Sequence, residues 1–319
     1  MIRAILAVAM VFAQFGAAAQ TFPVKPVRVI IGNGPGTSPD IQMRILAEKL
    51  AAEWKQQLVI ENMPGASGNI AAERVLAAPP DGYTLFYASI GPLAINMHLY
   101  SKLSYDIVRD FAPVTQVSRL SNLLLVHPSL PPKSVKELIA LARKRPGELR
   151  YGSGGNGTSL HLAGEMLKVM AAINILHVPY KTSPQMTTDL IGGHLDLAFH
   201  NSPVAMPHVQ SGRLRALAVT SDRRQPYAPE LPTVAEAGVP GFEITIGGGL
   251  VAPRRVPEAL IEKINADLQR ALHLPEIKDA YTRNYLEITA RAPKEFATWQ
   301  KAEIEKMGKL VRASGAKLD

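Results

Sequence analysis

The sequence predicts an α/β protein in which mainly parallel β-strands are flanked by helices. Three observations lead to this fold class: short β-branched runs alternate with segments of helical periodicity, glycine-rich turns stand between several strands and the helices after them, and the C-terminal part is mostly helical. The chain has 319 residues, 47% of them hydrophobic. That length is enough for about two domains on a prior of roughly 150 residues each, so two sheets are favoured over one.

The order of the elements follows from local patterns. Residues 27–31 form a β-branched run typical of a strand, and residues 41–54 repeat apolar side chains on one helical face. Ser134 and Glu137 form a capping box for a helix that the Pro-Gly pair at 146–147 ends. Further strands are expected at 58–60, 83–87, 123–126, 149–152, 175–178, 195–199 and 214–219. Further helices are expected at 69–78, 158–170, 257–273, 275–284 and 293–312, and one more helix precedes the strand at 195–199 and ends at residue 191.

Residues 1–19 are typical of a signal peptide. Arg3 precedes a short apolar run at 4–13, and Ala17 and Ala19 provide the small side chains that a signal peptidase requires. The run is too short to span ~30 Å comfortably, and Gln14 interrupts it, which argues against a membrane anchor. We therefore expect secretion with cleavage near Ala19. No cysteine stands there to carry a lipid, so the mature chain should be free.

The charge and cysteine content exclude several classes of protein. Lys and Arg number 35 against 27 Asp and Glu, and the excess is spread along the chain. This distribution favours attraction of small anions over a nucleic-acid stripe, so no nucleic-acid partner is expected. The absence of cysteine excludes disulfides, zinc ribbons and cysteine nucleophiles. The eight histidines are scattered without zinc spacing, and neither a metal nor a cofactor is expected.

Three glycine-rich turns carry the functional signal, at 32–40, 62–69 and 152–159. Each lies between a strand and the start of a helix. Glycine there lets backbone N–H groups approach a ligand closely, and the helix N-terminus adds a partial positive charge. Each turn is therefore a potential anion cradle, although a single turn of this kind often carries glycine for geometric reasons alone.

Nucleotide binding and catalysis are disfavoured. Residues 152–157 match G-x-G-x-x-G, but residues 175–179 lack the acidic residue that a dinucleotide fold places there. The chain has no H-E-x-x-H and no G-x-S-x-G motif. Ser67 only resembles a nucleophile elbow, because Asn69 fills the final glycine position, and Ser153 lacks the spacing altogether. A secreted α/β hydrolase acting through Ser67 or Ser153 remains as an alternative.

Many collinear motifs carry a resemblance to a known family. They include KPVRVII at 25–31, ENMPGASGN at 61–69, PDGYTL at 80–85, GGNGTS at 154–159 and LPTVAEAG at 231–238. With these stretches the chain resembles the substrate-binding proteins of tripartite tricarboxylate transporters, the Bug-type periplasmic receptors, from about Phe22 to the C-terminus.

The resemblance implies a two-lobed periplasmic receptor with a ligand cleft between the lobes. The chain would cross between lobes near 119–126 and 243–251, which gives one lobe of 20–122 plus 248–319 and a second of 123–247. Such a protein is a monomer, not an enzyme, that binds a small organic carboxylate and delivers it to membrane permease subunits; a carboxylate-binding sensor partner is the other alternative. The implied ligand-binding residues are Asn33, Gly34, Pro35, Gly36, Thr37, Asp40, Ser67, Gly68 and Ser89 in the first lobe, and Ser153, Gly154, Asn156, Gly157, Thr158, Ser159 and His200 in the second.

The chain departs from the family at three places, which bear on the identity of the ligand. The first turn lacks the usual aromatic-Pro-Pro-Gly-Gly sequence, His200 stands where the family has Asp, and Gly247 and Gly248 stand where it often has aromatics. A cationic His200 would favour a di- or polycarboxylate or an aromatic acid and would tighten binding at lower pH, unless His200 faces away from the cleft. The two glycines imply a roomier cleft wall or merely a β-bulge.

The glycine turns also give a steric expectation. If the backbone amides of residues 33–37 and 153–159 meet at one ligand, the chain approaches it closely at Gly36 and Gly157. Both positions should then tolerate no Cβ.

Overall fold

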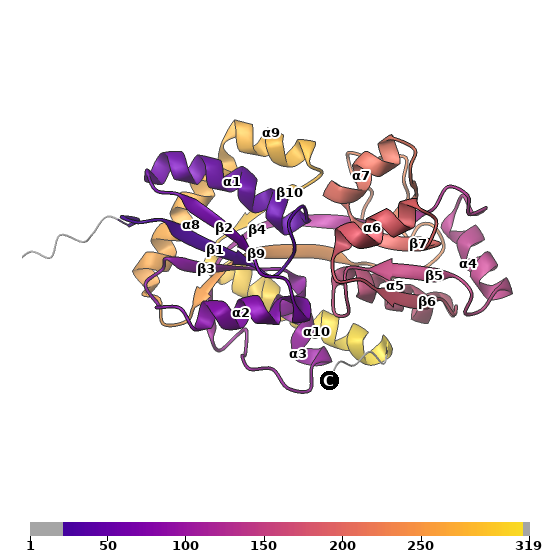
Figure 1. Cartoon of the computed structure of the whole chain (residues 1–319), viewed down its shortest axis with the longest axis horizontal. Helices are drawn as coiled ribbons and strands as arrows, with labels where there is room; N and C mark the ends of the chain where they lie inside the picture. The colour runs from indigo at the N-terminus through magenta and orange to yellow at the C-terminus, as the bar shows by residue number, and fades with distance from the viewer. Residues whose placement is uncertain (1–21, 315–319) are drawn as a thin grey trace, which may run out of the picture.

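The computed structural model describes residues 22–314 and shows two α/β lobes joined by two long strands (Figure 1). The strands and helices of the first lobe are β1 (Val27–Ile31), α1 (Ser38–Trp54), β2 (Leu58–Asn62), α2 (Asn69–Leu76), β3 (Thr84–Ala88), α3 (Asn96–Leu99), α8 (Glu258–His273), α9 (Pro275–Arg283) and β10 (Glu287–Arg291). Those of the second are α4 (Val135–Lys144), β5 (Arg150–Ser153), α5 (Ser159–Ala171), β6 (Leu176–Pro179), α6 (Ser183–Ile191), β7 (Leu197–Asn201), α7 (Ser202–Gln210) and β8 (Arg215–Val219).

The two long strands, β4 (Phe111–Val126) and β9 (Thr245–Pro253), run between the lobes. The strand order through the molecule is β2-β1-β3-β9-β4-β7-β5-β6, with β8 and β10 also paired to β4. The pairs β1–β2, β1–β3, β5–β6 and β5–β7 are parallel, whereas β4 is antiparallel to all its partners. The parallel pairs thus lie within one lobe or the other, whereas the long strand β4, which runs from one lobe to the next, pairs only in the antiparallel direction.

The partner of β4 changes at one point along its length. Ser121 is paired with Thr245 of β9, and the next residue, Asn122, is paired with Asn201 of β7. The first part of β4 thus belongs to the sheet of the first lobe and the last part to the sheet of the second.

Several elements differ from those expected from sequence. The strand expected at 123–126 begins at Phe111, because its first part is rich in polar residues that mask a buried strand. Helix α7 was not expected, since it contains Pro207 as well as an early proline. Strand β10 was also missed. The capping box is confirmed in part: Ser134 Oγ accepts a hydrogen bond from Glu137 N at 3.2 Å, but the Glu137 carboxylate accepts from Lys133 N at 2.7 Å.

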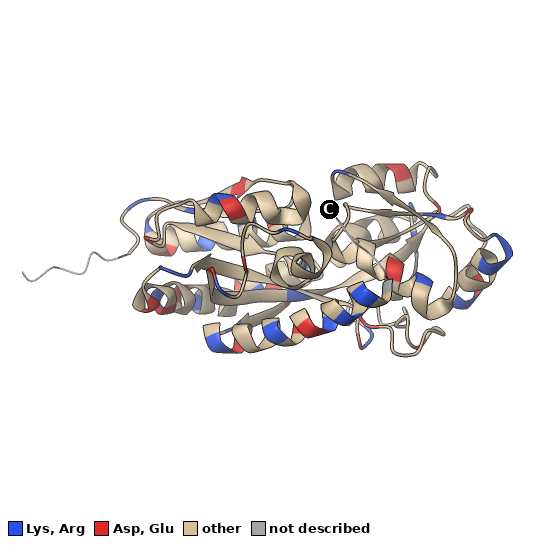
Figure 2. Cartoon of the chain, turned by 90° about the horizontal axis from the view of Figure 1, so that it is seen from below, with Lys and Arg blue, Asp and Glu red and all other residues tan. Residues whose placement is uncertain are grey.

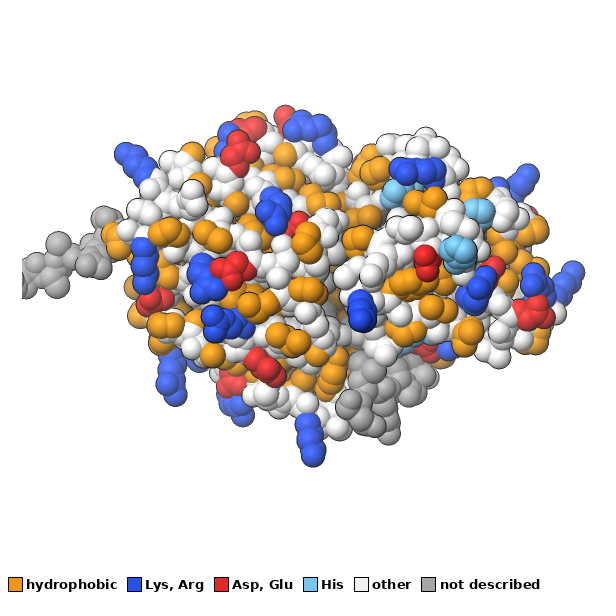
Figure 3. Space-filling model, viewed as in Figure 1, with side chains coloured by type: hydrophobic (Ala, Val, Ile, Leu, Met, Phe, Trp, Pro, Cys, Tyr) orange, Lys and Arg blue, Asp and Glu red, His pale blue; other side chains and the backbone are white. Residues whose placement is uncertain are grey.

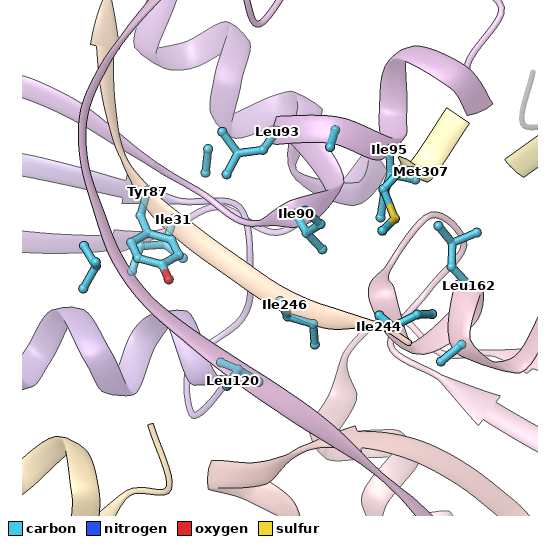
Figure 4. Close-up of a cluster of buried hydrophobic side chains, with 14 of the residues drawn as sticks. Ile31, Tyr87, Ile90, Leu93, Ile95, Leu120, Leu162, Ile244, Ile246 and Met307 are labelled. Carbon is cyan, nitrogen blue, oxygen red and sulfur yellow. The ribbon is translucent and has the colours of Figure 1, made fainter. Parts of the chain in front are cut away.

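Hydrophobic packing continues through the junction of the lobes. Figure 4 shows Tyr87 of β3 and Leu120 of β4 near Ile246 of β9, with Leu162 of α5 and Met307 of the C-terminal helix farther along; all five are buried. That helix, α10 (Pro293–Ser314), packs against β4 and α5 and so touches both lobes. The junction is consequently part of the main core and not a bare linker.

Charged side chains of both signs are intermixed on the surface. Figure 2 shows Lys and Arg beside Asp and Glu over both lobes, including along α10. Among residues 22–314, no helix combines the length and the apolar character needed to cross a membrane. The signal peptide expected at 1–19 lies outside the described residues.

Candidate functional site

A cavity of about 70 Å³ lies between the lobes, and a wider mouth of about 640 Å³ adjoins it. Figure 3 shows a notch in the surface between the two lobes. The inner cavity is bounded by the loops before α1 and α5, by the starts of α6 and α7, and by β4 and β9 where they cross. Residues that line both the cavity and the mouth come from both lobes: Asn33, Thr37, Ser67, Gly154, Thr158 and Ser183.

The turn before α1 is closed by its own side chains. Thr37 Oγ1 donates to Gly34 O at 2.7 Å, and Asp40 Oδ2 accepts from Gly36 N at 2.9 Å. Burial opposes ionisation of Asp40, but the ion pair with Arg44 at 2.9 Å and the Gly36 amide lower the pKa of this carboxyl overall. The Asp40 carboxylate and the Gly36 amide therefore bind each other and stabilise the turn, so neither is offered to a ligand.

The turn before α5 uses most of its amides internally. Gly157 N donates to His161 Nδ1 at 3.2 Å, Gly155 N donates to Ser153 Oγ at 3.2 Å, and Thr158 Oγ1 accepts from His161 N at 3.3 Å. The first-turn amides of Ser159 and Leu160 have no acceptor within residues 22–314, as is usual at a helix start. These two amides are the ones that α5 offers to a ligand.

The cavity is positive without a cationic side chain. Ser38, Ser159 and Ser183 line it and are the first residues of α1, α5 and α6. Each helix N-terminus carries a partial positive charge of about half an elementary unit. The residues that line the cavity include no Lys, Arg, His, Asp or Glu, and the mouth adds Lys181. This arrangement suits a small anion held by backbone dipoles and hydroxyl groups.

The structure brings many of the expected site residues together. Those that line the cavity are Asn33, Thr37, Ser67, Ser89, Gly154, Gly157, Thr158 and Ser159. Gly34 and Asn156 line the mouth. Pro35, Gly36, Asp40, Gly68, Ser153 and His200 line neither. At Gly36 an added Cβ would meet nothing within 4 Å, so its positive φ of 74° and not a close approach accounts for the glycine.

Sequence reasoning missed several residues of the lining: Ser38, Pro39, Gln42, Tyr87, Ile90, Gly91, Leu120, Leu160, Ser183, Asn201 and Ile246. One signal could have identified two of them. Ser38 and Gln42 are four residues apart, so they share the face of α1 that begins at the first glycine turn. The others come from segments far apart in sequence that only the folded chain brings together.

His200 does not face the cavity, which corrects the expectation that it binds the ligand. Its side chain is buried, and its Nε2 atom lies 2.8 Å from Thr187 Oγ1 of α6. Side chains alternate along a strand, and it is the next residue of β7, Asn201, that lines the cavity. Burial, with a smaller effect of His208, lowers the pKa of His200 to about 3, so the imidazole is neutral.

We expect this buried histidine to make the protein less stable in acid. The unfolded His200 titrates near 6.5 and the folded one at about 3, so its contribution is complete above pH 6.5 and falls as the pH drops towards 3. One such group changes the free energy of unfolding by up to roughly 1.4 kcal/mol per pH unit. Urea unfolding at pH 7 and pH 5 should show a smaller acid loss in His200→Gln than in wild type.

The control for this experiment is His273→Gln, a substitution at an exposed histidine of α8. It should retain the acid loss of the wild type. An equal acid loss in His200→Gln and wild type would show that His200 is not a buried neutral group.

Gly247 and Gly248 are required by neighbouring aromatic rings. A Cβ at Gly248 would lie 2.4 Å from the Tyr87 hydroxyl oxygen, and one at Gly247 would lie 2.5 Å from the Trp299 ring and 2.4 Å from Gln116 Nε2. The register of β4 against β9 also shifts between Gln116 and Ser118. Tyr87 of β3, which lines the cavity, therefore fills the space beside Gly248, and Trp299 of α10 fills the space beside Gly247. The irregularity in register accompanies this packing.

The lobes touch each other across the cavity at Ser67. Its hydroxyl donates a hydrogen bond to Asn156 O of the second lobe, and its backbone φ of 55° is left-handed. Asn96 Nδ2 donates to Ser67 O at 3.1 Å and supports this conformation. A non-glycine residue held in this region costs of order 1–3 kcal/mol, which the surrounding contacts must offset. Ser67 is thus a contact of the closed arrangement.

The second candidate nucleophile, Ser153, is buried away from the cavity. Its hydroxyl lies 2.7 Å from His177 Nε2, and the ring of His177 stacks on that of His161 at 4.3 Å. Burial, followed by the charge of His161, lowers the pKa of His177 to about 4. The pair resembles a serine–histidine dyad in distance, but Ser153 lines neither the cavity nor its mouth.

These features define a two-lobed solute-binding protein, and comparison with known proteins supports the assignment. Residues 42–316 match the family described as tripartite tricarboxylate transporter family receptor, and the chain belongs to that family. A curated relative, the UPF0065 protein in the tcbD-tcbE intergenic region of Pseudomonas sp. strain P51, is 34% identical over 91% of this chain and 86% of its own length.

Two solved structures resemble the chain along almost its whole length. R. palustris Rpa4515 with adipate superposes with a TM-score of 0.90 at 36% identity, covering 93% of this chain and 100% of that one. MatC from Rhodopseudomonas palustris with bound malate gives a TM-score of 0.86 at 30% identity, covering 91% and 100%. Both proteins hold a carboxylate, and the expected fold is confirmed.

Proposed function

We propose that this protein is a periplasmic receptor that binds a small organic carboxylate between its lobes and delivers it to the permease of a tripartite tricarboxylate-type transporter. One observation carries the proposal: helix N-termini from both lobes meet at a cavity whose lining has hydroxyl and amide donors but no Lys, Arg, His, Asp or Glu side chain. Adipate and malate in the related structures support the ligand class.

Binding would proceed by closure of the lobes on the anion. We place the first lobe at 20–122 plus 248–319 and the second at 123–247, with hinges near 119–126 and 243–251. The change of partner of β4 between Ser121 and Asn122 supports these limits. In the open form the starts of α1 and α5 would separate, and a bound carboxylate would offset the cost of bringing two partial positive charges together.

The proposal includes no catalytic step. Ser67 lines the cavity, but its hydroxyl donates to the Asn156 carbonyl, and no histidine or carboxylate of residues 22–314 lines the cavity to activate it. Ser153 lies beside His177 but lines neither the cavity nor its mouth. Delivery to a signalling receptor in place of a permease would use the same cavity. A pull-down with the permease subunits distinguishes these two fates of the bound receptor.

We expect carboxylates, as a class, to raise the melting temperature of the mature protein. A ligand that binds only the folded state stabilises it by RT ln(1 + [L]/Kd), which is about 2.7 kcal/mol at a hundredfold excess over Kd. The measurement is a thermal-shift screen of mono-, di- and tricarboxylates, aromatic acids and amino acids, followed by titration calorimetry. The matched alcohols and amides should give no shift. A screen in which no carboxylate acts would contradict the proposed function.

A further inference from the structure

Three residues that line the cavity carry a buried polar atom without a partner in the described part of the chain: Asn33 Oδ1 in the loop before α1, and Ser38 Oγ and Gln42 Nε2 on α1 itself. Ser38 Oγ and Gln42 Nε2 make no hydrogen bond within the described part of the chain, and both residues are only 1% exposed. Both line the cavity, and they lie one turn apart on the same face of α1. A buried donor without an acceptor costs about 1–3 kcal/mol, so this face of α1 is suited to a ligand.

The orientation of the Gln42 amide is fixed by its neighbours. Tyr87 Oη donates to Gln42 Oε1 at 3.0 Å, and Ser118 Oγ donates to the same oxygen at 2.5 Å. The opposite orientation would leave both buried hydroxyl hydrogens and the amide oxygen without partners. Gln42 therefore presents a neutral N–H donor, and not an acceptor, to the cavity.

The position of this donor is separate from the anion site. Gln42 lies one helical turn below Ser38, about 6 Å deeper along α1 from its N-terminus. The cavity is also bounded by apolar side chains, including Leu120 and Ile246 from the crossing strands. A ligand that reaches from the helix N-termini to Gln42 thus has anion-binding amides at one end and an N–H donor at the other.

We propose that Gln42, aided by Ser38, is the specificity-determining residue of this receptor and selects a linear acid whose second end accepts hydrogen bonds, such as an α,ω-dicarboxylate. The inference rests on the proposed function, since the first carboxylate must occupy the amides at the helix starts. An ammonium group at the second end is disfavoured because it would face another donor.

The experiment compares α,ω-dicarboxylates of four to eight carbons with monocarboxylates of equal length by titration calorimetry at pH 8. Wild type should bind the best diacid at least tenfold more tightly than its monoacid. In Gln42→Glu a carboxylate still accepts from Tyr87 and Ser118 but repels the second end of the ligand. The ratio of diacid to monoacid affinity should fall at least tenfold, and an ω-amino acid of the same length should gain affinity relative to the diacid.

Two further variants complete the experiment: one controls for the added charge, and the other removes the donor without adding charge. Gln57→Glu adds the same charge at an exposed position and should keep the wild-type ratio. Gln42→Met removes the donor without adding charge and should lower the same ratio, which keeps the test open if Gln42→Glu fails to fold. A ratio unchanged in a folded Gln42 variant, or equal affinities for diacid and monoacid in wild type, would overturn the inference. Failure of wild type to bind either kind of acid would overturn the proposed function itself.

Discussion

Gly157→Val is expected to lower the affinity for the carboxylate by more than tenfold, which is more than 1.4 kcal/mol. Gly157 lines the cavity at the point where the two lobes meet. A Cβ there would lie 3.0 Å from Ser67 Oγ and 3.1 Å from Leu99 Cδ1, both of the first lobe. Because valine adds two more methyl groups, it would hold the lobes apart and remove the closed form that binds the ligand. Titration calorimetry with the acid found in the thermal screen measures the change.

A matched control separates this steric effect from backbone strain. Gly212 of the second lobe has a φ of 71°, close to the 78° of Gly157, but an added Cβ would meet nothing within 4 Å. Gly212→Val should therefore carry the same conformational penalty and leave affinity unchanged. If a folded Gly157→Val bound as tightly as wild type, closure through the Ser67–Gly157 contact would not be needed for binding.

Local signals predicted the parts of the site that depend on local structure. The glycine turns before α1 and α5 lie at the cavity because a strand end, a loop and a helix start are contiguous in sequence. The helix starts themselves follow from capping residues such as Thr158 and Ser134. The resemblance to the receptor family added the two lobes and the crossings, which no local pattern could indicate.

The features that the sequence did not predict, the first part of β4 and the residue of β7 that lines the cavity, both depend on tertiary packing. Gln116, Ser121 and Asn122 are buried in β4, and their polar groups hid the strand from a search for apolar runs. The junction satisfies some of them across the chain, as where Ser121 Oγ accepts from Thr220 N at 3.1 Å. His200 and Asn201 differ by one position in β7, and only the tertiary packing of that strand decides which of them faces the ligand.

The role of Gln42 depends on contacts that no single segment contains. Its amide is oriented by Tyr87 of β3 and Ser118 of β4, and its donor faces a cavity closed from the other lobe. The same tyrosine explains Gly248 of β9, whereas Trp299 and Gln116 occupy the space beside Gly247. An aromatic ring expected on β9 is replaced here by rings that other elements supply, and Tyr87 serves both the packing of the junction and the position of the Gln42 donor.

This arrangement predicts that Gly248→Ala destabilises the protein. Tyr87 is 2% exposed and tied to Gln42, so it cannot move away from a Cβ placed 2.4 Å from its hydroxyl oxygen. Overpacking of this kind costs about 1–3 kcal/mol, and the roughly 0.4–1 kcal/mol gained by restricting the unfolded chain offsets only part of it. Urea unfolding followed by circular dichroism gives the change in free energy.

A double-mutant cycle with Tyr87→Phe tests the cause. Removing the hydroxyl leaves the ring carbon Cζ, 2.8 Å from the added Cβ, as the nearest atom, so the double variant should lose less stability than the sum of the two single variants. Gly34→Ala is the control for stability, because its Cβ would meet only Thr182 Cγ2, at 3.7 Å. If the losses of unfolding free energy in the two single variants were additive, or if Gly248→Ala were as stable as wild type, the backbone of β9 must shift to make room for the added Cβ. In that case Tyr87 does not require the glycine.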